Sequence, residues 1–127
     1  MTLVDTSAWI HLLRPDGDPA VAGHVRNALE QGEACWCAMI RLELWNGAGG
    51  SREKRVLKDF EAALIDLPIN EPVWECANDL ARVCRKAGVT VPATDLLIAA
   101  CAAHHGARIE TTDGDFEKIA RAGKSVR

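Results

Sequence analysis

Short apolar segments alternate with helical patterns along this chain. Residues 2–4, 34–37, 65–67 and 107–110 are too short for helices and are bounded by polar or turn-forming residues, so each predicts a strand. Strands of this length that alternate with helices are typical of an α/β fold with a mainly parallel sheet. Residues 1–127 are therefore predicted to form one α/β domain, with four or five short strands flanked by helices.

The segments between these strands carry apolar residues at helical spacing. Val21, Val25 and Leu29 share one helical face, and the segment that begins near Thr94 is apolar on every side, which predicts a buried central helix. Helices are predicted over residues 6–13, 19–31, 39–46, 51–64, 71–87 and 94–105, and a helix or turn over residues 113–121. Residues 123–127 either add an edge strand or hang free.

Composition is that of an ordinary globular protein, with 48% hydrophobic and 26% charged residues. No apolar run reaches the roughly 18–20 residues of a membrane span, and the sequence shows no signal peptide. Five cysteines dispersed through apolar segments predict reduced, buried thiols. We therefore expect a cytoplasmic protein with no membrane partner.

The net charge of −3 and the isoelectric point of about 5.8 argue against a generally basic nucleic-acid-binding protein. Basic residues nevertheless gather in residues 51–58 and in the last ten residues. Such runs are either solvated faces or contacts to phosphate groups. The candidate phosphate contacts are Arg52, Arg55, Lys118 and Arg121.

Asp5 directly follows the first predicted strand and is followed by Thr6 and Ser7, which have the chemistry of a helix start. Open parallel sheets bind ligands outside the carboxyl ends of their strands, beside helix N-termini. Asp5 is therefore either a helix cap or a ligand to a bound group, and this segment alone does not separate the two interpretations.

Asp95 is the only charged residue between Gly88 and His104, and it lies in the first turn of the all-apolar helix. Thr94 is available as the cap of that helix, which leaves Asp95 in a buried element. An ionised carboxylate is costly to bury without a partner, and no Lys or Arg is near it in sequence. A metal ion would supply the missing partner.

Three further acids follow the same pattern. Glu43 lies between Leu42 and Leu44 on a predicted helix, and Asp113 and Asp115 follow the fourth strand. Each alone has an ordinary explanation as an ion-paired or capping residue. Together with Asp5 and Asp95 they are expected to meet at one edge of a small parallel sheet, where they repel one another unless a cation lies between them.

Oxygen ligands favour Mg²⁺ or Mn²⁺ over zinc, and such sites hydrolyse phosphodiesters. Our hypothesis is that Asp5 and Asp95 hold the principal ion and that Glu43 and Asp113 complete its shell partly through water, which also supplies the nucleophile.

Four short motifs, in this order and spacing, resemble those of PIN-domain ribonucleases, in particular the VapC toxins of bacterial toxin–antitoxin pairs. The motifs are LVDTS at 3–7, IRLEL at 40–44 with Gly47 after it, DLLIAA at 95–100 and TTDGDF at 111–116, and they span essentially the whole chain. The pattern more often has an apolar or aromatic residue where this chain has Glu110, and the segment after Gly123 is short.

The resemblance implies a PIN-like three-layer fold and a metal-dependent endoribonuclease that acts on structured RNA such as tRNA. It also implies a homodimer and a cognate antitoxin, VapB-like, whose C-terminal segment covers the site. Carried over residue by residue, it implies an acidic site of Asp5, Glu43, Asp95 and Asp113, supported by hydrogen bonds from Thr6, Ser7 and Thr111, with Asp115 as an auxiliary acid.

Other interpretations agree less well with the sequence. Cys35, Cys37, Cys101 and the adjacent His104 and His105 could be drawn as a zinc site, but their spacing matches no common zinc motif. A phosphatase of the haloacid dehalogenase type needs paired aspartates after the first strand. A response regulator needs a second acid beside the first-strand Asp and a late-strand Lys. A PIN-like module that binds RNA or a partner without cleaving remains the alternative.

Overall fold

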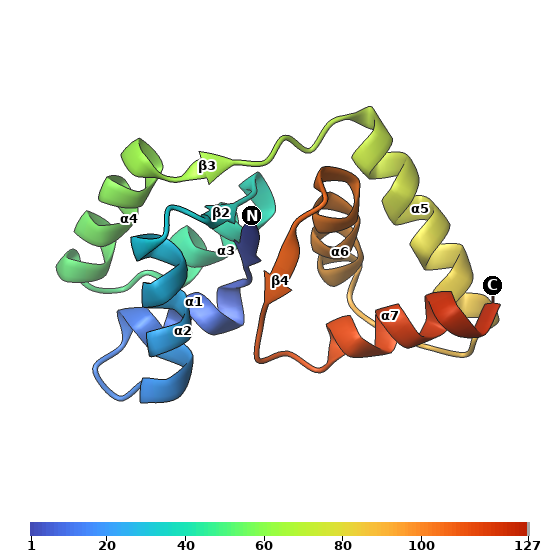
Figure 1. Cartoon of the computed structure of the whole chain (residues 1–127), viewed down its shortest axis with the longest axis horizontal. Coiled ribbons are helices and arrows are strands. Elements are labelled where there is room, and N and C mark those ends of the chain that lie inside the picture. The colour runs from blue at the N-terminus through green and yellow to red at the C-terminus, as the bar shows by residue number, and fades with distance from the viewer. Residues whose placement is uncertain (127) are drawn as a thin grey trace.

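The computed structural model describes residues 1–126 and has a sheet of four short parallel strands (Figure 1). The strands are β1 (Thr2–Val4), β2 (Ala34–Trp36), β3 (Ile65–Asp66) and β4 (Arg108–Glu110), in the spatial order β3-β2-β1-β4. Each neighbouring pair is parallel, because every connection between paired strands crosses over through helices. The predicted α/β class and the positions of the four strands are confirmed.

Helices take up most of the rest of the chain and agree with the predicted segments to within a few residues. The exception is the C-terminal segment, where residues 123–126 continue the last helix instead of forming an edge strand. β4 is therefore an edge of the sheet within the described residues. The helices are α1 (Thr6–Leu13), α2 (Pro19–Glu30), α3 (Ala38–Gly47), α4 (Ser51–Ala63), α5 (Glu71–Lys86), α6 (Ala93–His105) and α7 (Asp115–Val126).

The core lies between the sheet and its helices. On the α4 side, Phe60 packs against two buried tryptophans, with ring centroids 4.9 Å from Trp9 and 6.2 Å from Trp36. On the other side, α5, α6 and α7 pack on one another (Figure 1), and Ile98 and Cys101 of α6 are fully buried. The all-apolar pattern of α6 thus correctly predicted a central helix.

None of the five cysteines forms a disulfide, as expected for reduced cysteines, and four of the five are buried. Within residues 1–126, no helix is both long enough and apolar enough to cross a membrane.

The register of the sheet fixes where the chain leaves β1 and β4. Val4 pairs with Glu110, and the next residue, Asp5, donates its backbone N–H to the Glu110 carbonyl at 2.9 Å. Asp5 and Thr111 therefore leave adjacent parallel strands at the same level. This pairing brings residues more than 100 positions apart to one point of the carboxyl edge of the sheet.

The backbone of the turn between α1 and α2 packs tightly against the backbone of the last turn of α1. A Cβ atom added to Gly17 would lie 2.0 Å from the carbonyl oxygen of His11. The His11 ring braces the same turn, since its Nδ1 accepts the Asp18 backbone N–H at 2.9 Å. Only glycine fits position 17 without movement of the backbone.

We expect Gly17→Ala to lower the free energy of unfolding by about 1–3 kcal/mol, because the added methyl group overlaps main-chain atoms. Gly23→Ala is the matched control. Its Cβ would meet no atom within 4 Å inside α2, so alanine there should stabilise the protein by about 0.5–1 kcal/mol. Urea denaturation followed by circular dichroism measures both, and equal stabilities of the two variants would contradict the steric argument.

Candidate active site

Five carboxylates lie at the carboxyl edge of the sheet. Asp95, Asp113 and Asp115 each present an oxygen within 4.8 Å of the others, and they come from the first turn of α6 and from the loop that begins α7. Asp5 and Glu43 are close enough that their charges act on this group. The acids singled out from the sequence are therefore brought together, although Asp115, expected only as an auxiliary acid, lies in the closest group.

Three hydrogen bonds hold the Asp5 side chain, and all three end at the same carboxylate oxygen. Its Oδ2 accepts hydrogen bonds from the Ser7 hydroxyl (2.8 Å), the Thr111 hydroxyl (3.0 Å) and the Ser7 backbone N–H (3.4 Å). Asp5 is itself the N-cap of α1, so the helix-cap interpretation of this residue holds whether or not it also binds a ligand. One oxygen serves as the cap, and the other accepts no hydrogen bond from the described residues, which leaves it free for a ligand.

The two hydroxyls that hold Asp5 also fix the loop that carries Asp113. The Ser7 oxygen accepts the Thr112 N–H (3.0 Å), and the Thr111 oxygen accepts the Asp113 N–H (2.9 Å). Asp113 Oδ1 in turn accepts the Asp115 N–H at 2.9 Å. The predicted supporting role of these hydroxyls agrees with this geometry, in which β1, α1 and the loop before α7 are joined by one hydrogen-bond network.

Glu43 reaches the site from α3 and is held by the Thr6 hydroxyl, which donates to Glu43 Oε1 at 2.9 Å. Burial raises the pKa of Glu43, the Thr6 hydrogen bond opposes that rise, and the charges of Asp5 and Asp113 add to it. Thr6 thus supports Glu43, while Ser7 and Thr111 support Asp5.

Asp95 is the acid of the site whose pKa is shifted furthest from its ordinary value. Only 7% of it is exposed, and its Oδ2 is buried without a hydrogen-bond partner. Burial raises the pKa of Asp95 to about 7, with further contributions from Asp113, Asp5 and Asp115. Thr94 does not cap α6, because the helix already begins at Ala93 after the N-cap residue Pro92.

These observations fit a bound cation. A buried carboxylate oxygen without a partner, facing two more carboxylates, is stabilised by a positive charge between them. All of the potential metal ligands in this group are carboxylate oxygens, which suit a hard divalent ion. Among the described residues, this acidic trio is the only group of three or more potential ligands, so the cysteines and histidines considered for zinc do not form a metal site there.

The basic candidates differ in their surroundings. Lys118 Nζ lies 3.4 Å from Asp115 Oδ1, at the edge of the acidic cluster. Arg121 pairs with Glu117 one turn away (2.5 Å), and Arg52 donates to the Leu13 carbonyl (3.5 Å). Arg55 is exposed on α4.

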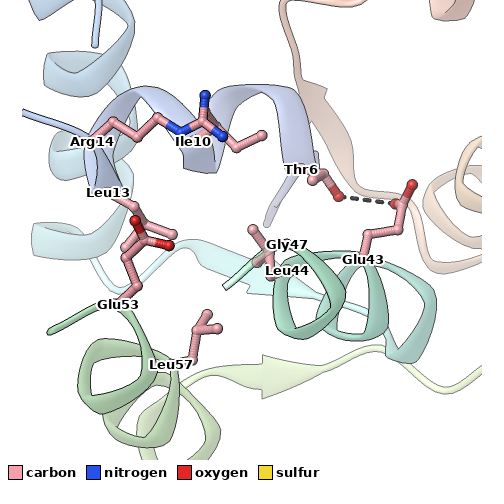
Figure 2. Close-up of a pocket in the computed structure, with 9 residues that line it drawn as sticks. All are labelled: Thr6, Ile10, Leu13, Arg14, Glu43, Leu44, Gly47, Glu53 and Leu57. Atoms are coloured by element: carbon pink, nitrogen blue, oxygen red, sulfur yellow. Dashed lines mark hydrogen bonds between the residues drawn. The ribbon is translucent and has the colours of Figure 1, made fainter. Parts of the chain in front are cut away.

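A hollow opens beside Glu43 and runs between α1, α3 and α4 (Figure 2). Arg14 and Glu53 lie along it, and neither was recognised as a site residue from the sequence. The only available signal was that Glu53 is the single acid in the basic run of residues 51–58. The lining residues are Thr6, Ile10, Leu13, Arg14, Glu43, Leu44, Gly47, Glu53 and Leu57.

Comparison with known proteins agrees with this geometry. The PIN domain family matches residues 2–122. Ribonuclease VapC11 of Mycobacterium tuberculosis and VapC ribonuclease Mb1587 of Mycobacterium bovis are each 38% identical over 125 residues, which cover 95% of this chain and 92% of each relative.

Solved structures with a similar fold include members of the VapBC family of toxin–antitoxin systems. VapBC2 of Rickettsia felis, bound to a DNA fragment from its promoter, has a TM-score of 0.76 at 14% identity and covers 94% of this chain and 91% of the matched chain. FitAcB of Neisseria gonorrhoeae has a TM-score of 0.73 at 20% identity and covers 94% of both chains.

The raised pKa of Asp95 predicts the pH dependence of the metal-free protein. Between pH 4 and 7 the native state keeps a proton that the unfolded chain, with an ordinary pKa of 3.8, has released, so stability should fall as pH rises through this range. Asp95→Asn removes this dependence and should stabilise the metal-free protein at pH 8 by about 1–2 kcal/mol.

Thermal unfolding in the presence of a chelator at several pH values measures this effect. Asp16→Asn, in the exposed turn after α1, is the control and should leave the pH profile unchanged. An Asp95→Asn protein that loses stability with rising pH as steeply as the wild type would contradict the assignment.

Proposed function

The chain belongs to the PIN-domain family as a VapC-family ribonuclease toxin, and we propose that it hydrolyses RNA phosphodiester bonds internally, with a divalent metal ion held by the acidic cluster. The observation that carries this proposal is the buried, unpartnered Oδ2 of Asp95 beside Asp113 and Asp115. A site built in this way is poorly stabilised without a cation and well suited to one.

We assign the ion to Mg²⁺ or Mn²⁺, because carboxylate oxygens supply all the ligands. Asp95, Asp113 and Asp115 would hold it, with Asp5 contributing its free oxygen and Glu43 acting through water. When bound, such an ion lowers the pKa of water and neutralises charge on the scissile phosphate. This assignment refines the original hypothesis, in which Asp5 and Asp95 were the principal ligands, by giving Asp115 a direct place.

Glu43 has the features of a proton acceptor. Thr6 occupies Oε1, which leaves Oε2 to accept a proton from the attacking water. Its raised pKa brings its basicity closer to the value that is useful near neutral pH. Ser7 and Thr111 hold Asp5 in a fixed orientation, so the cluster is ordered before the substrate arrives.

The RNA backbone must approach a negatively charged site, so nearby cations are needed. Lys118 is the best placed, because its ammonium group already lies at the edge of the cluster beside Asp115. Arg55 is exposed and available, whereas Arg52 and Arg121 would first have to leave the partners described above. Binding through these residues should weaken as salt concentration rises. The family resemblance favours structured RNA such as tRNA as the substrate.

The partner implied by the similar structures is an antitoxin, since those structures are VapBC and FitAB toxin–antitoxin complexes. We propose that a cognate, VapB-like antitoxin neutralises this chain by covering the acidic site with its C-terminal segment.

A homodimer is supported by an apolar groove on the α3, α5 and α6 side. Trp74 of α5 is 48% exposed and lines this groove together with Met39 and Leu96, and Leu42 of α3 is 61% exposed. A tryptophan exposed to this extent is typical of an interface. The groove also contains Thr94, next to Asp95, so a second copy bound there would lie close to the acidic site.

We expect Asp95→Ala and Asp113→Ala each to reduce RNA cleavage at least about 100-fold while the fold is retained, because each removes a metal ligand. Cleavage of a labelled RNA in Mg²⁺ or Mn²⁺ and Mn²⁺ binding by calorimetry should fall together, and a chelator should abolish wild-type cleavage. Asp16→Asn is the control and should keep both properties. Full activity in Asp95→Ala would overturn the site assignment.

The dimer surface predicts a change of assembly state. Trp74→Glu places a charge in the apolar groove and should convert the dimer to a monomer in light scattering coupled to size exclusion, at concentrations where the wild type is dimeric. Glu75→Lys changes the charge at the neighbouring exposed position of α5 outside the groove, so it is the control and should remain dimeric. A dimeric Trp74→Glu protein would exclude this surface as the interface.

A further inference from the structure

Strand β4 is an edge of the sheet within the described residues, and its outward backbone groups are unpaired. The Arg108 N–H donates to the Met1 carbonyl at 3.1 Å, and two residues further along the Glu110 carbonyl accepts a backbone N–H at 2.9 Å. Both residues therefore face β1, and because backbone groups alternate in direction along a strand, Ile109 turns its N–H and its carbonyl away from β1. Neither of these groups is hydrogen-bonded to the described residues. Such an edge is a template for pairing with another strand.

The side chains of Arg108 and Glu110 carry opposite charges on one face of β4, because they are two residues apart. The Arg108 guanidinium lies 4.0 Å from Glu33, and both of these side chains are more than half exposed. Glu110 lies 3.4 Å from His24, which is 72% exposed. Exposed pairs of this kind contribute little to stability, so both charges are available to other partners. Edge strands that avoid self-pairing commonly carry charge that repels a second copy, whereas β4 carries one charge of each sign.

We propose that β4 pairs with β4 of a second copy of this chain, in an antiparallel ladder centred on Ile109. The Ile109 N–H of each copy would donate to the Ile109 carbonyl of the other, which satisfies both outward groups. Arg108 of each copy would lie opposite the partner's Glu110, so the ladder would contain two pairs of unlike charges. A two-fold axis would relate the copies, with the same surface on both sides of the contact. This inference goes beyond the proposed RNA-cleaving function and does not depend on it.

The charges select this register. Antiparallel ladders that use the outward backbone groups can also be centred on Arg108 or on Glu110. Centring on Arg108 sets two guanidinium groups opposite each other, and centring on Glu110 sets two carboxylates opposite each other, so like charges meet in both cases. A parallel ladder in register would likewise place each charge beside its own copy. Only the ladder centred on Ile109 opposes unlike charges, so the strand is complementary to itself.

Apolar surface adjoins the same edge. The Ile109 side chain lines a groove of about 580 Å³ together with Phe116, Ile119 and Ala120 of α7. Apolar grooves that open at the surface commonly mark contact sites, so a second copy on β4 would cover apolar side chains as well as pair backbone groups. None of the residues that line this groove lines the groove that contains Trp74. The two surfaces are separate, so copies that associate through Trp74 can also pair through β4.

Pairing at β4 would leave both acidic sites open. The two strands would run in opposite directions, so the carboxyl edges that carry the acids would face opposite sides of one continuous sheet. With a rise of about 3.4 Å per residue, Thr111 of one copy would lie about 14 Å from the partner's Thr111 along the strand direction. Variants that prevent the pairing should therefore keep their RNA cleavage.

Sedimentation velocity over a wide range of concentrations tests the pairing, in the Trp74→Glu protein so that the Trp74 groove does not contribute. This protein should change from monomer to dimer as its concentration rises. Arg108→Glu and Glu110→Arg, each added singly, place like charges opposite each other and should raise the dissociation constant at least about tenfold. The two exchanges combined should restore the dimer, because unlike charges meet again.

Arg55→Glu is the matched charge control, because it lies on α4 at the β3 end of the sheet (Figure 1), and it should leave the dissociation constant unchanged. Hydrogen exchange gives a separate readout of the backbone contact. Protection of the Ile109 amide should rise with protein concentration, and Arg108→Glu should abolish this rise. None of these measurements uses RNA, so they succeed or fail independently of the proposed nuclease activity.

A Trp74→Glu protein that stays monomeric at every concentration would overturn the inference. A dimer that Arg108→Glu leaves unchanged, or a double exchange that keeps its circular dichroism spectrum but does not pair, would also refute it. If the Trp74→Glu protein is dimeric at every concentration, dissociation of that dimer by Arg108→Glu would support pairing through β4. Weaker antitoxin binding by Arg108→Glu, with self-association unchanged, would assign this edge to the antitoxin and contradict the inference.

Discussion

Mutual repulsion among carboxylates at the carboxyl edge of the sheet is the constraint on which the rest of this structure depends. Five acids point toward one region, and the oxygens of three of them lie within 4.8 Å of one another. Hydrogen bonds from neutral donor groups offset part of the free-energy cost of this repulsion. Asp5 receives three hydrogen bonds at one oxygen, and Glu43 receives one from Thr6. Asp95 receives none at its buried oxygen. The site is thus ordered but electrostatically incomplete, which is the condition under which a cation binds strongly.

The fold maintains this crowding because the hydroxyl network that orients the acids is also structural. Ser7 belongs to α1 and Thr111 follows β4, and each contacts both Asp5 and the loop before α7. The pairing of β1 with β4 holds these segments in register. Asp95 is fixed separately, because it lies in the first turn of the buried helix α6. Repulsion therefore cannot be relieved by moving one loop alone, since that movement would break backbone pairing or core packing elsewhere.

Much of the fold and most of the acidic cluster could be predicted from the sequence, because the signals were local. Asp95 was identified as a site residue because a lone charge in an all-apolar helix requires a partner, and the strand-end positions of Asp5 and Asp113 followed from short apolar segments. Capping was predicted less well. α6 begins at Ala93, directly after its N-cap Pro92, which is one residue earlier than predicted. Asp5 is both the N-cap of α1 and a residue of the candidate site. Arg14 had no local signal, and Glu53 had only its place as the single acid in residues 51–58, because the two line one hollow only once α1 and α4 are packed. Residues 123–126 extend α7, although they could also have formed a strand.

The acidic cluster carries a single sign of charge, which limits what it can recognise. With a metal ion it would interact with phosphates, which are the same at every nucleotide, so it would supply chemistry without sequence preference. Selection of the cleaved bond would therefore have to come from contacts made outside the carboxylates. The Thr6–Glu43 hydrogen bond, at 2.9 Å, joins the cluster to the hollow between α1, α3 and α4, and Lys118 lies beside Asp115, so both neutral and basic groups border the carboxylates.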